Sequence, residues 1–259
     1  MTYQTLEVEI RDSVATVWMN RADAHNAFNE TLIQELTNAF ELLGHDPAVR
    51  VVVLAGRGKS FSAGADLEWM KRASGYSDEE NRRDARKLSK MFTTIHRLSK
   101  PTVARVHGAA LGGGVGLSAA CDIVVATTGA SFATTEVKLG LIPSVISPYV
   151  IAAIGQRQAH RYFLTAERFD AAEASRIGLV HVLCAPEELD EKVTAVTGML
   201  VANSPMAQAS AKELIFNVSG HPIEDVLIED TAQRIAKSRA TAEAKEGIAA
   251  FLEKRKPRW

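Results

Sequence analysis

The sequence predicts an α/β fold that is followed by a helical C-terminal region. In the first half, short apolar β-branched runs alternate with longer segments whose apolar residues recur every three to four positions, as in strands layered with helices. After about Pro143 the segments are mostly typical of helices, and Leu179–Leu183 alone is typical of a strand. We therefore expect an α/β core over residues 1–195 and a helical region over residues 196–259.

The first predicted elements are a hairpin, a helix and a buried strand. The β-branched runs Thr5–Ile10 and Val14–Trp18 are separated by a short polar turn, which predicts a hairpin. Asn29 precedes an amphipathic helix and can cap it, because an Asn side chain accepts hydrogen bonds from free N–H groups of a first turn. Arg50–Ala55 is a continuous apolar run, the pattern expected of a buried parallel strand.

A second helix and two more strands follow. Ser77 and Glu80 have the spacing of a capping box, in which each side chain bonds the other residue's backbone N–H group. We expect this helix to end near Lys100-Pro101, because the residue before a proline is disfavoured in a helix. Strands are predicted at Thr102–Val106 and Ile123–Ala126.

The second half is predicted to be mostly helical. Ser204-Pro205 marks one helix start, since serine is a good N-cap and proline suits the first helical position. The predicted helices are Tyr149–Ile154, Arg157–Leu164, Ala171–Ile177, Pro186–Val201, Pro205–Val218, Ile223–Ser238 and Ala242–Lys254.

The composition excludes several classes of protein. Of the 259 residues, 46% are hydrophobic and 24% are charged, which is typical of globular domains rather than of disordered or collagen-like chains. The net charge of -1 offers no general basic surface for nucleic acid. No apolar run reaches about 18 residues, so we expect no membrane span. The N-terminal residues include early acids and no apolar segment, so we expect no secretory signal. The two cysteines lack CxxC spacing, and with the missing signal they predict a cytoplasmic protein without disulfides.

The most unusual segment is His107–Leu117, in which five of the residues from 108 to 116 are glycine. It follows a predicted strand and precedes an alanine-rich helical segment, so its N–H groups are suited to bind developing negative charge. A tight turn with close packing is the alternative explanation. A dinucleotide fingerprint would need glycine at Leu117, and Gly58-Lys59-Ser60 does not complete a phosphate-binding loop because Val53 replaces its first glycine.

Two other segments contain candidate functional residues. Small residues in segment 59–67 let a backbone approach a ligand, and Asp66 can cap a helix that starts at Leu67, although a simple strand-end loop is the alternative. Glu136 lies in the weakly polar segment Phe132–Pro143, where burial would raise its pKa toward the range of acid–base catalysis. A solvated or ion-paired glutamate is the alternative there. The histidines lack metal-ligand spacing, so we expect no metal site.

In their order and spacing, these segments resemble the crotonase superfamily of enoyl-CoA hydratases and isomerases over nearly the whole chain. The residues that carry the resemblance are Asn20-Arg21, Asn26-Ala27-Phe28, Phe61–Leu67, Lys100-Pro101, Gly108, Leu111–Gly114, Cys121-Asp122 and Phe132–Pro143. The resemblance implies an α/β spiral of ββα units whose helical C-terminal region forms homotrimers or homohexamers. It also implies an acyl-CoA thioester as ligand and no separate cofactor, because coenzyme A is part of the substrate.

The resemblance implies roles for individual residues. The backbone N–H groups of Ala65 and Gly113 match the pair that polarises the thioester carbonyl, and Glu136 matches a catalytic glutamate. Phe251 and Lys254 match positions that reach coenzyme A from a neighbouring subunit. The other expected contacts to coenzyme A or substrate are Ala24, Ala63, Gly64, Asp66, Leu67, Gly112 and Gly116, and the candidate phosphate contacts are Arg57, Lys59 and Lys71.

The chain departs from the family pattern in two places. Gly116 stands where typical hydratases have a second catalytic glutamate, and Ser144–Val150 replaces a glycine-rich segment. This combination resembles bacterial methylglutaconyl-CoA and isohexenylglutaconyl-CoA hydratases, which implies hydration of a 3-methyl-branched enoyl-CoA. A single-glutamate enoyl-CoA isomerase and a non-catalytic acyl-CoA-binding protein are the alternatives.

Overall fold

The computed structural model describes residues 3–259, and its centre is a six-stranded sheet in the order β1-β2-β3-β4-β6-β9. Neighbouring strands are parallel except β1 and β2, which form the predicted antiparallel hairpin. The strands are β1 Leu6–Arg11, β2 Val14–Met19, β3 Val51–Gly56, β4 Thr102–Val106, β6 Ile123–Thr127 and β9 Val182–Cys184. β9 starts later than predicted, because the N–H groups of Leu179 and Val180 instead bond the carbonyl of Ala174 and close the preceding helix.

A second sheet of three very short strands has the order β5-β7-β8. β5 (Ala109–Leu111) and β7 (Ser131–Ala133) are parallel, and β8 (Phe169–Asp170) is antiparallel to β7. None of the three was predicted, since strands of two or three residues are too short to show an alternating pattern. β5 lies within the glycine-rich segment, so its pairing with β7 brings that segment next to the residues that lead to Glu136.

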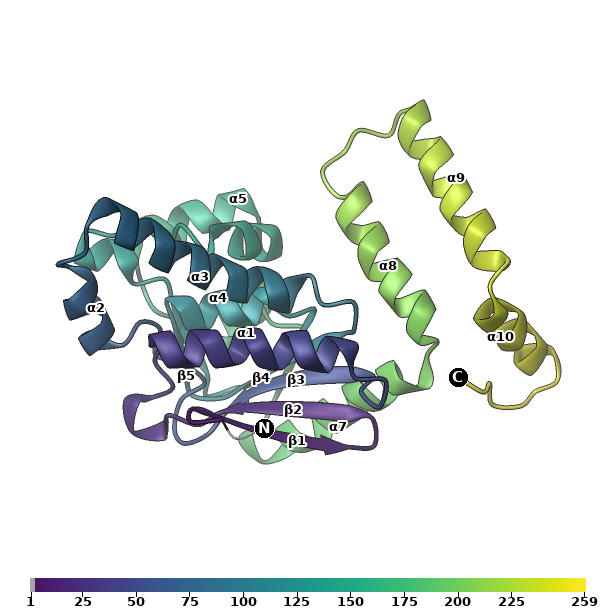
Figure 1. The fold of residues 1–259 in the computed structure, drawn as a ribbon, viewed down its shortest axis with the longest axis horizontal. Coiled ribbons are helices and arrows are strands. Elements are labelled where there is room, and N and C mark those ends of the chain that lie inside the picture. Colours follow the sequence, from purple (N-terminus) through teal and green to yellow (C-terminus); the bar gives the residue numbers. More distant parts are fainter. Residues whose placement is uncertain (1–2) are drawn as a thin grey trace.

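Helices cover both faces of the larger sheet, which explains why β3 is buried along its whole length (Figure 1). α1 (Glu30–His45) and α3 (Asp78–His96) pack together over one face, and α7 (Leu189–Ala202) packs on the other. Both predicted caps form, at Asn29 and at the Ser77–Glu80 capping box. The α7 face is a small apolar cluster built from Val51, Val53, Val103, Val125, Cys184, Leu189, Val193 and Val196.

The helix α5 (Ser147–Thr165) is divided by Gly155, whose φ of 74° and ψ of 157° are not helical. The division confirms the two separate helices that the sequence predicts in this region. Glycine accepts the left-handed φ without the steric cost that a side chain would impose. The remaining short elements are the 3₁₀ turns η1 Ala22–Ala24, η2 Glu136–Leu139 and η3 Pro186–Glu188, and the helices α2 Leu67–Ala73, α4 Gly113–Ala120 and α6 Ala171–Arg176.

The last three helices form a C-terminal arm that stands away from the sheet (Figure 1). They are α8 Pro205–Val218, α9 Asp225–Arg239 and α10 Ala242–Leu252. Nζ of Lys212 anchors the arm by an ion pair of 2.7 Å to Oδ2 of Asp122, and the ring of Phe216 packs on His96 with centroids 4.8 Å apart. The predicted division between residues 195 and 196 falls inside α7, which packs on the sheet, so the chain leaves the core after Ala202.

Many large apolar side chains of the arm point outward rather than into the protein. The exposed ones are Met206, Ile215, Ile223, Val226, Ile228, Ile235, Ile248, Phe251 and Leu252. Within residues 3–259, no helix combines the length and the apolar character that a membrane span requires.

Candidate active site

The loop after β3 and the strand β5, which are far apart in the sequence, lie side by side. The N–H group of Ser62 donates to the carbonyl of Ala109 at 3.0 Å, and that of Leu111 donates to the carbonyl of Ser62 at 2.9 Å. These bonds lay the loop after β3 along β5, as in one more rung of a parallel sheet. The structure thereby brings Gly64 and Ala65 to the start of α4, where Gly112 and Gly113 lie.

The N–H groups of Ala65 and Gly113 are free in the part of the chain that the structure describes: neither donates a hydrogen bond to a protein atom. The residues on each side of Ala65 are tied down instead, because the carbonyl of Gly64 and the N–H of Asp66 both bond Phe28, at 2.6 and 2.9 Å. Gly113 is the first residue of α4, so its N–H belongs to the positive end of a helix. The pair is suited to hold an oxygen on which negative charge develops.

Glycine is required here because the backbones approach each other closely. A Cβ on Gly64, whose φ is +87°, would lie 2.7 Å from the carbonyl oxygen of Leu111 and 3.5 Å from the nitrogen of Gly113. A Cβ on Gly113 would lie 2.4 Å from Cε2 of Phe28. The close packing of the turn and its free N–H groups therefore occur together. The tight-turn and anion-binding explanations of this segment are compatible.

Glu136, at the start of η2, places its carboxyl beside this turn. A Cβ on Gly112 would lie 3.1 Å from Oε1 of Glu136. Oε2 of Glu136 is buried and has no hydrogen-bond partner among the described residues. Burial raises the pKa of Glu136 above its ordinary value, and a hydrogen bond from its own backbone N–H offsets only part of that effect. A carboxyl whose pKa is raised in this way holds its proton more readily than a solvated glutamate, which suits a group that transfers protons.

Asp66 has a different environment from Glu136 and a different task. Its side chain accepts hydrogen bonds from the N–H groups of Glu68 and Trp69 and pairs with Nη2 of Arg21 at 2.8 Å, which confirms the predicted cap on α2. Burial alone would raise the pKa of Asp66, but the bonds from Arg21 and from the backbone outweigh it and lower the pKa. Asp66 is thus an ionised residue that fixes the position of the Ala65 loop.

Of the residues expected to hold coenzyme A, Ala63 lies on the same loop as Ala65, Leu67 begins the helix α2 that follows this loop, and Ala24 lies on a neighbouring turn. The N–H of Ala63 donates to the carbonyl of His25 at 2.9 Å, which places Ala63 next to the turn that contains Ala24. Leu67 has an exposed fraction of 80%, so it is open to a ligand.

Asn26, which the sequence analysis did not single out as a site residue, holds this region together. It is fully buried with φ of +53°, and its Nδ2 bonds the carbonyls of Arg57 and Ser60, each at 2.9 Å. Its position inside the motif Asn26-Ala27-Phe28 was the available signal.

Gly116 is not next to open space. A Cβ on Gly116 would lie 2.3 Å from Cγ2 of Ile146 and 3.0 Å from Cε1 of Phe92. Ile146 is 4% exposed and precedes the first residue of α5. Apolar side chains therefore fill the volume that a side chain at position 116 would occupy.

Phe251 and Lys254 are not brought to Glu136 by their own chain. Phe251 lies on α10 with an exposed fraction of 82%, and α10 packs on α8 and α9, away from α4 (Figure 1). Lys59 and Lys71 are exposed on the surface near the Ala65 loop.

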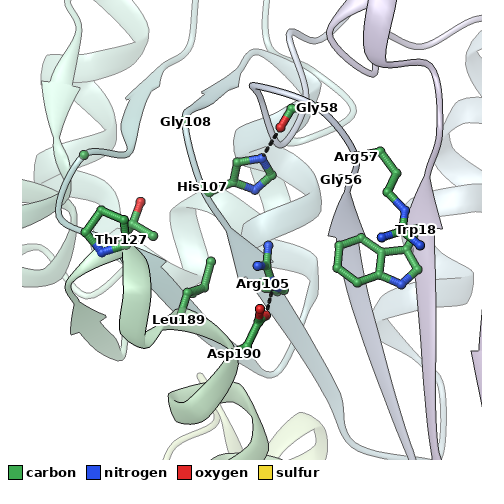
Figure 2. A pocket seen from close by; sticks show the side chains of 12 residues that line it. Trp18, Gly56, Arg57, Gly58, Arg105, His107, Gly108, Thr127, Leu189 and Asp190 are labelled. Carbon is green, nitrogen blue, oxygen red and sulfur yellow. Dashed lines mark hydrogen bonds and ion pairs between the residues drawn. The ribbon is translucent and has the colours of Figure 1, made fainter. Parts of the chain in front are cut away.

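A cavity of about 620 Å³ opens at the carboxyl ends of β3, β4 and β6, and Arg57 is its one lining residue among the expected catalytic, coenzyme A and phosphate contacts (Figure 2). The guanidinium of Arg57 lies 3.9 Å above the Trp18 ring and is paired with Glu7 and Glu9, so it is already neutralised. Arg105 on the neighbouring strand is paired with Asp190 at 2.7 Å. This cavity is separate from the Glu136 site.

Comparison with known proteins adds an independent observation. The family model described as enoyl-CoA hydratase/isomerase matches residues 9–259. The crystal structure of an enoyl-CoA hydratase from Shewanella pealeana superposes with a TM-score of 0.96 at 40% identity, covering 99% of this chain and 96% of that one. A crotonyl-CoA hydratase of Syntrophomonas wolfei is 34% identical, covering 99% of this chain and 98% of its own. A short-chain-enoyl-CoA hydratase of Clostridium acetobutylicum is 33% identical, covering 99% and 97%.

Proposed function

The chain belongs to the enoyl-CoA hydratase/isomerase family and has the crotonase fold, and from this premise we propose that it is an enoyl-CoA hydratase. The proposed reaction adds water across the C2–C3 double bond of an α,β-unsaturated acyl-CoA thioester. The observation that carries the proposal is the buried Oε2 of Glu136, which lies beside the glycine-rich turn and has no hydrogen-bond partner within residues 3–259. The hydratases of Syntrophomonas wolfei and Clostridium acetobutylicum support it, since they align with this chain almost end to end.

In the proposed mechanism, the thioester oxygen accepts hydrogen bonds from the N–H groups of Ala65 and Gly113. Attack of water on C3 moves electron density to this oxygen and creates an enolate. Backbone donors fixed in advance stabilise that charge without reorganisation, and one such donor contributes about 10²–10³ in rate. Small residues suffice at both positions because the main chain supplies the donors.

Glu136 is the proposed carrier of the proton. Its carboxylate takes a proton from water as the water oxygen bonds to C3, and the carboxyl then delivers a proton to C2 on the same face. The residue ends in the state in which it began, so one carboxyl completes the addition. A raised pKa suits a group that must accept and release a proton in turn. This chemistry needs no cofactor besides the coenzyme A of the substrate.

We propose that coenzyme A lies along the backbone of Ala24, Ala63 and Leu67, with the thioester at Ala65. We also propose a homotrimer or homohexamer in which Phe251 and Lys254 of one subunit reach the coenzyme A of the next. The outward apolar side chains of the arm support this assembly, because an uncovered apolar surface of this extent is typical of subunit contacts.

The proposed acyl group is 3-methyl-branched and glutaconyl-like. The sequence of the segment Ser144–Val150 is the basis for it, and the apolar side chains of Ile146 and Phe92 over Gly116 are compatible with a branched carbon chain. An enoyl-CoA isomerase is a second candidate, because the filled space at Gly116 leaves Glu136 as the one carboxyl that we assign to the site, and a proton shift between carbons needs one base.

A panel of linear, 3-methyl-branched and carboxylated 2-enoyl- and 3-enoyl-CoAs, with mass spectra of the products, tests the proposal. A gain of one water marks hydration, an unchanged mass with a moved double bond marks isomerisation, and binding without turnover marks a non-catalytic protein. Glu136→Gln is expected to abolish hydration while coenzyme A ester binding persists. Near-normal turnover by this variant would refute the role of Glu136.

A further inference from the structure

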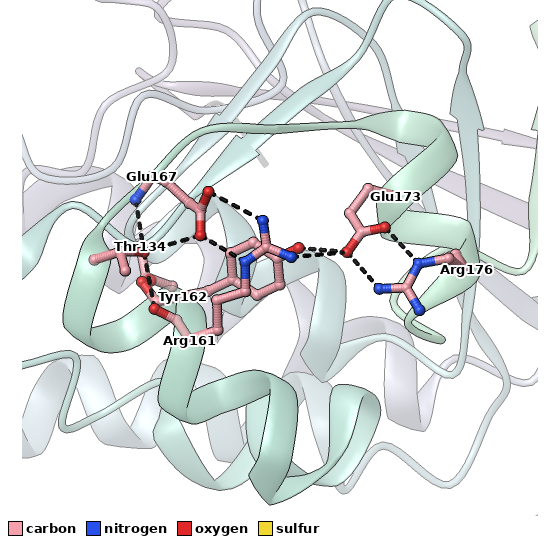
Figure 3. A network of polar contacts seen from close by, with 7 residues as sticks. Thr134, Arg161, Tyr162, Glu167, Glu173 and Arg176 are labelled. Atoms are coloured by element: carbon pink, nitrogen blue, oxygen red, sulfur yellow. Dashed lines mark hydrogen bonds and ion pairs between the residues drawn. The ribbon is translucent and has the colours of Figure 1, made fainter.

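Thr134 stands two residues before Glu136, directly after β7, and is 2% exposed. Its hydroxyl donates a hydrogen bond of 2.8 Å to the backbone carbonyl of Tyr162, which lies in the second half of α5 (Figure 3). Among the described residues, no other side chain of segment 133–136 makes a hydrogen bond to a residue outside that segment. The Thr134 hydroxyl is thus the side-chain link between the Glu136 segment and α5.

The opposite side of the same segment is bound to the glycine-rich turn. The N–H of Gly112 donates to the carbonyl of Ala133 at 2.8 Å. Consecutive residues, Ala133 and Thr134, are therefore tied to two different elements just before the chain turns into η2. Glu136 depends on these ties, because its Oε2 has no hydrogen bond of its own in the described part of the chain.

The carbonyl that Thr134 uses is itself rigidly held. Tyr162 is 1% exposed, and its hydroxyl donates to Oε1 of Glu173 at 2.5 Å (Figure 3). Hydrogen bonds from Arg176 and then from Tyr162 lower the pKa of Glu173 to about 2, so this acceptor stays ionised. The Tyr162 ring packs on Phe169 at 4.2 Å between centroids, and Phe169 stacks on Phe132 of β7 at 5.7 Å.

We infer that Thr134 is a positioning residue for Glu136: its hydroxyl sets where the carboxyl stands relative to Gly112 and to the free N–H of Gly113. The inference rests on the proposed function of Glu136. A catalytic carboxyl that is hydrogen-bonded to no other residue takes its position from the backbone that carries it. A displacement of about 1 Å at a reacting group can cost up to about 10² in rate.

The variants Thr134→Val and Thr134→Ser separate position from stability. Valine keeps the shape but removes the donor, and the Tyr162 carbonyl still accepts from the N–H of Ala166 at 3.1 Å, so no polar group is left unpaired. For Thr134→Val we expect kcat to fall roughly 5- to 30-fold at nearly constant KM. We also expect the acid limb of its pH–rate profile to move to lower pH, because a displaced carboxyl is better solvated and its pKa falls. Serine keeps the hydroxyl and is expected to retain kcat within about twofold, although it loses a buried methyl group.

Thr37→Val is the matched control. Thr37 is also buried, and its hydroxyl donates to the carbonyl of Ile33 at the same 2.8 Å, but within α1 and away from Glu136. We expect its kcat and pH profile to be unchanged. A Thr134→Val variant with wild-type kcat and pH profile, beside an inactive Glu136→Gln, overturns the inference and leaves the proposed function standing.

A measurement without turnover keeps the two hypotheses apart. If the wild-type protein converts no member of the enoyl-CoA panel, the proposed function fails. The carboxyl pKa of Glu136 can still be followed by infrared difference spectroscopy, with Glu136→Gln to assign the band. A lower pKa in Thr134→Val supports positioning of the carboxyl by Thr134, and an unchanged pKa overturns it.

Discussion

Replacing Gly116 by alanine is expected to destabilise the protein, although alanine favours a helix more than glycine does. The new methyl group would lie 2.3 Å from Cγ2 of Ile146, 2.8 Å from its Cβ and 3.0 Å from Cε1 of Phe92. Favourable contacts between carbon atoms lie at about 3.5–4.0 Å, so neighbouring atoms must retreat by more than about 1 Å.

The magnitude follows from two opposing effects. Overpacking a buried site costs about 1–3 kcal/mol. The change from glycine to alanine inside a helix contributes about 1 kcal/mol in the other direction. We expect a net loss of up to about 2 kcal/mol in the free energy of unfolding, measured by urea denaturation of the purified protein.

Two further variants show that the contact with Ile146 is the cause. Gly198→Ala is the matched control, because Gly198 is also inside a helix but, beyond its chain neighbours and the backbone of its own helix, no described atom lies within 4 Å of the added Cβ. We expect it to be neutral or stabilising. Ile146→Ala removes Cγ2 but leaves Cβ, so it should relieve the Gly116→Ala clash in part. We expect the double variant to be more stable than the sum of the single effects predicts, by about 1 kcal/mol. Additive effects, or a Gly116→Ala variant as stable as Gly198→Ala, would refute the reasoning.

Three other outcomes are expected. Burial raises the pKa of Glu136, so the contribution of this residue to stability is present at low pH and is lost as pH rises through its folded-state pKa. Glu136→Gln should therefore raise the free energy of unfolding at about pH 8 but not at about pH 4. The same variant should lower the rate of hydration by about 10² or more. The pKa of Asp66 is lowered, so its contribution is present at neutral pH and lost as pH falls through the folded-state pKa; Asp66→Asn should cost about 1–2 kcal/mol at pH 7 in urea titrations, with a smaller difference in acid. Phe251→Glu should weaken the proposed assembly in analytical ultracentrifugation without changing the circular dichroism spectrum, since the side chain is 82% exposed.

The larger elements of the fold could be predicted because their signals are local. A capping box, a run of valines or a proline after a serine acts within a few residues, and α3, β3 and α8 follow from them. The strands β5 and β7 could not be predicted in this way. Each has three residues, and each exists because it pairs with a segment distant in sequence.

The candidate site shows the same limit. The pairing of the free N–H groups of Ala65 and Gly113 depends on the close approach of Gly64 to Gly113. The residues around either glycine in the sequence do not indicate this contact. The resemblance to a family supplied that pairing. It did not supply the packing of Ile146 over Gly116 or the link from Thr134 to Tyr162, because both involve residues that depart from, or lie outside, the motifs that carry the resemblance.

The break at Gly155 gives α5 the character of two modules joined by a single hinge point. The N-terminal module follows Ile146, which packs against Gly116, and the C-terminal module contains Tyr162, which holds the Glu136 segment. A broken helix transmits a shift in one half poorly to the other half, because the hydrogen-bond ladder does not run through the joint. We therefore expect that substitutions around Ile146, in evolution or in a directed library, leave the position of the Glu136 carboxyl unchanged.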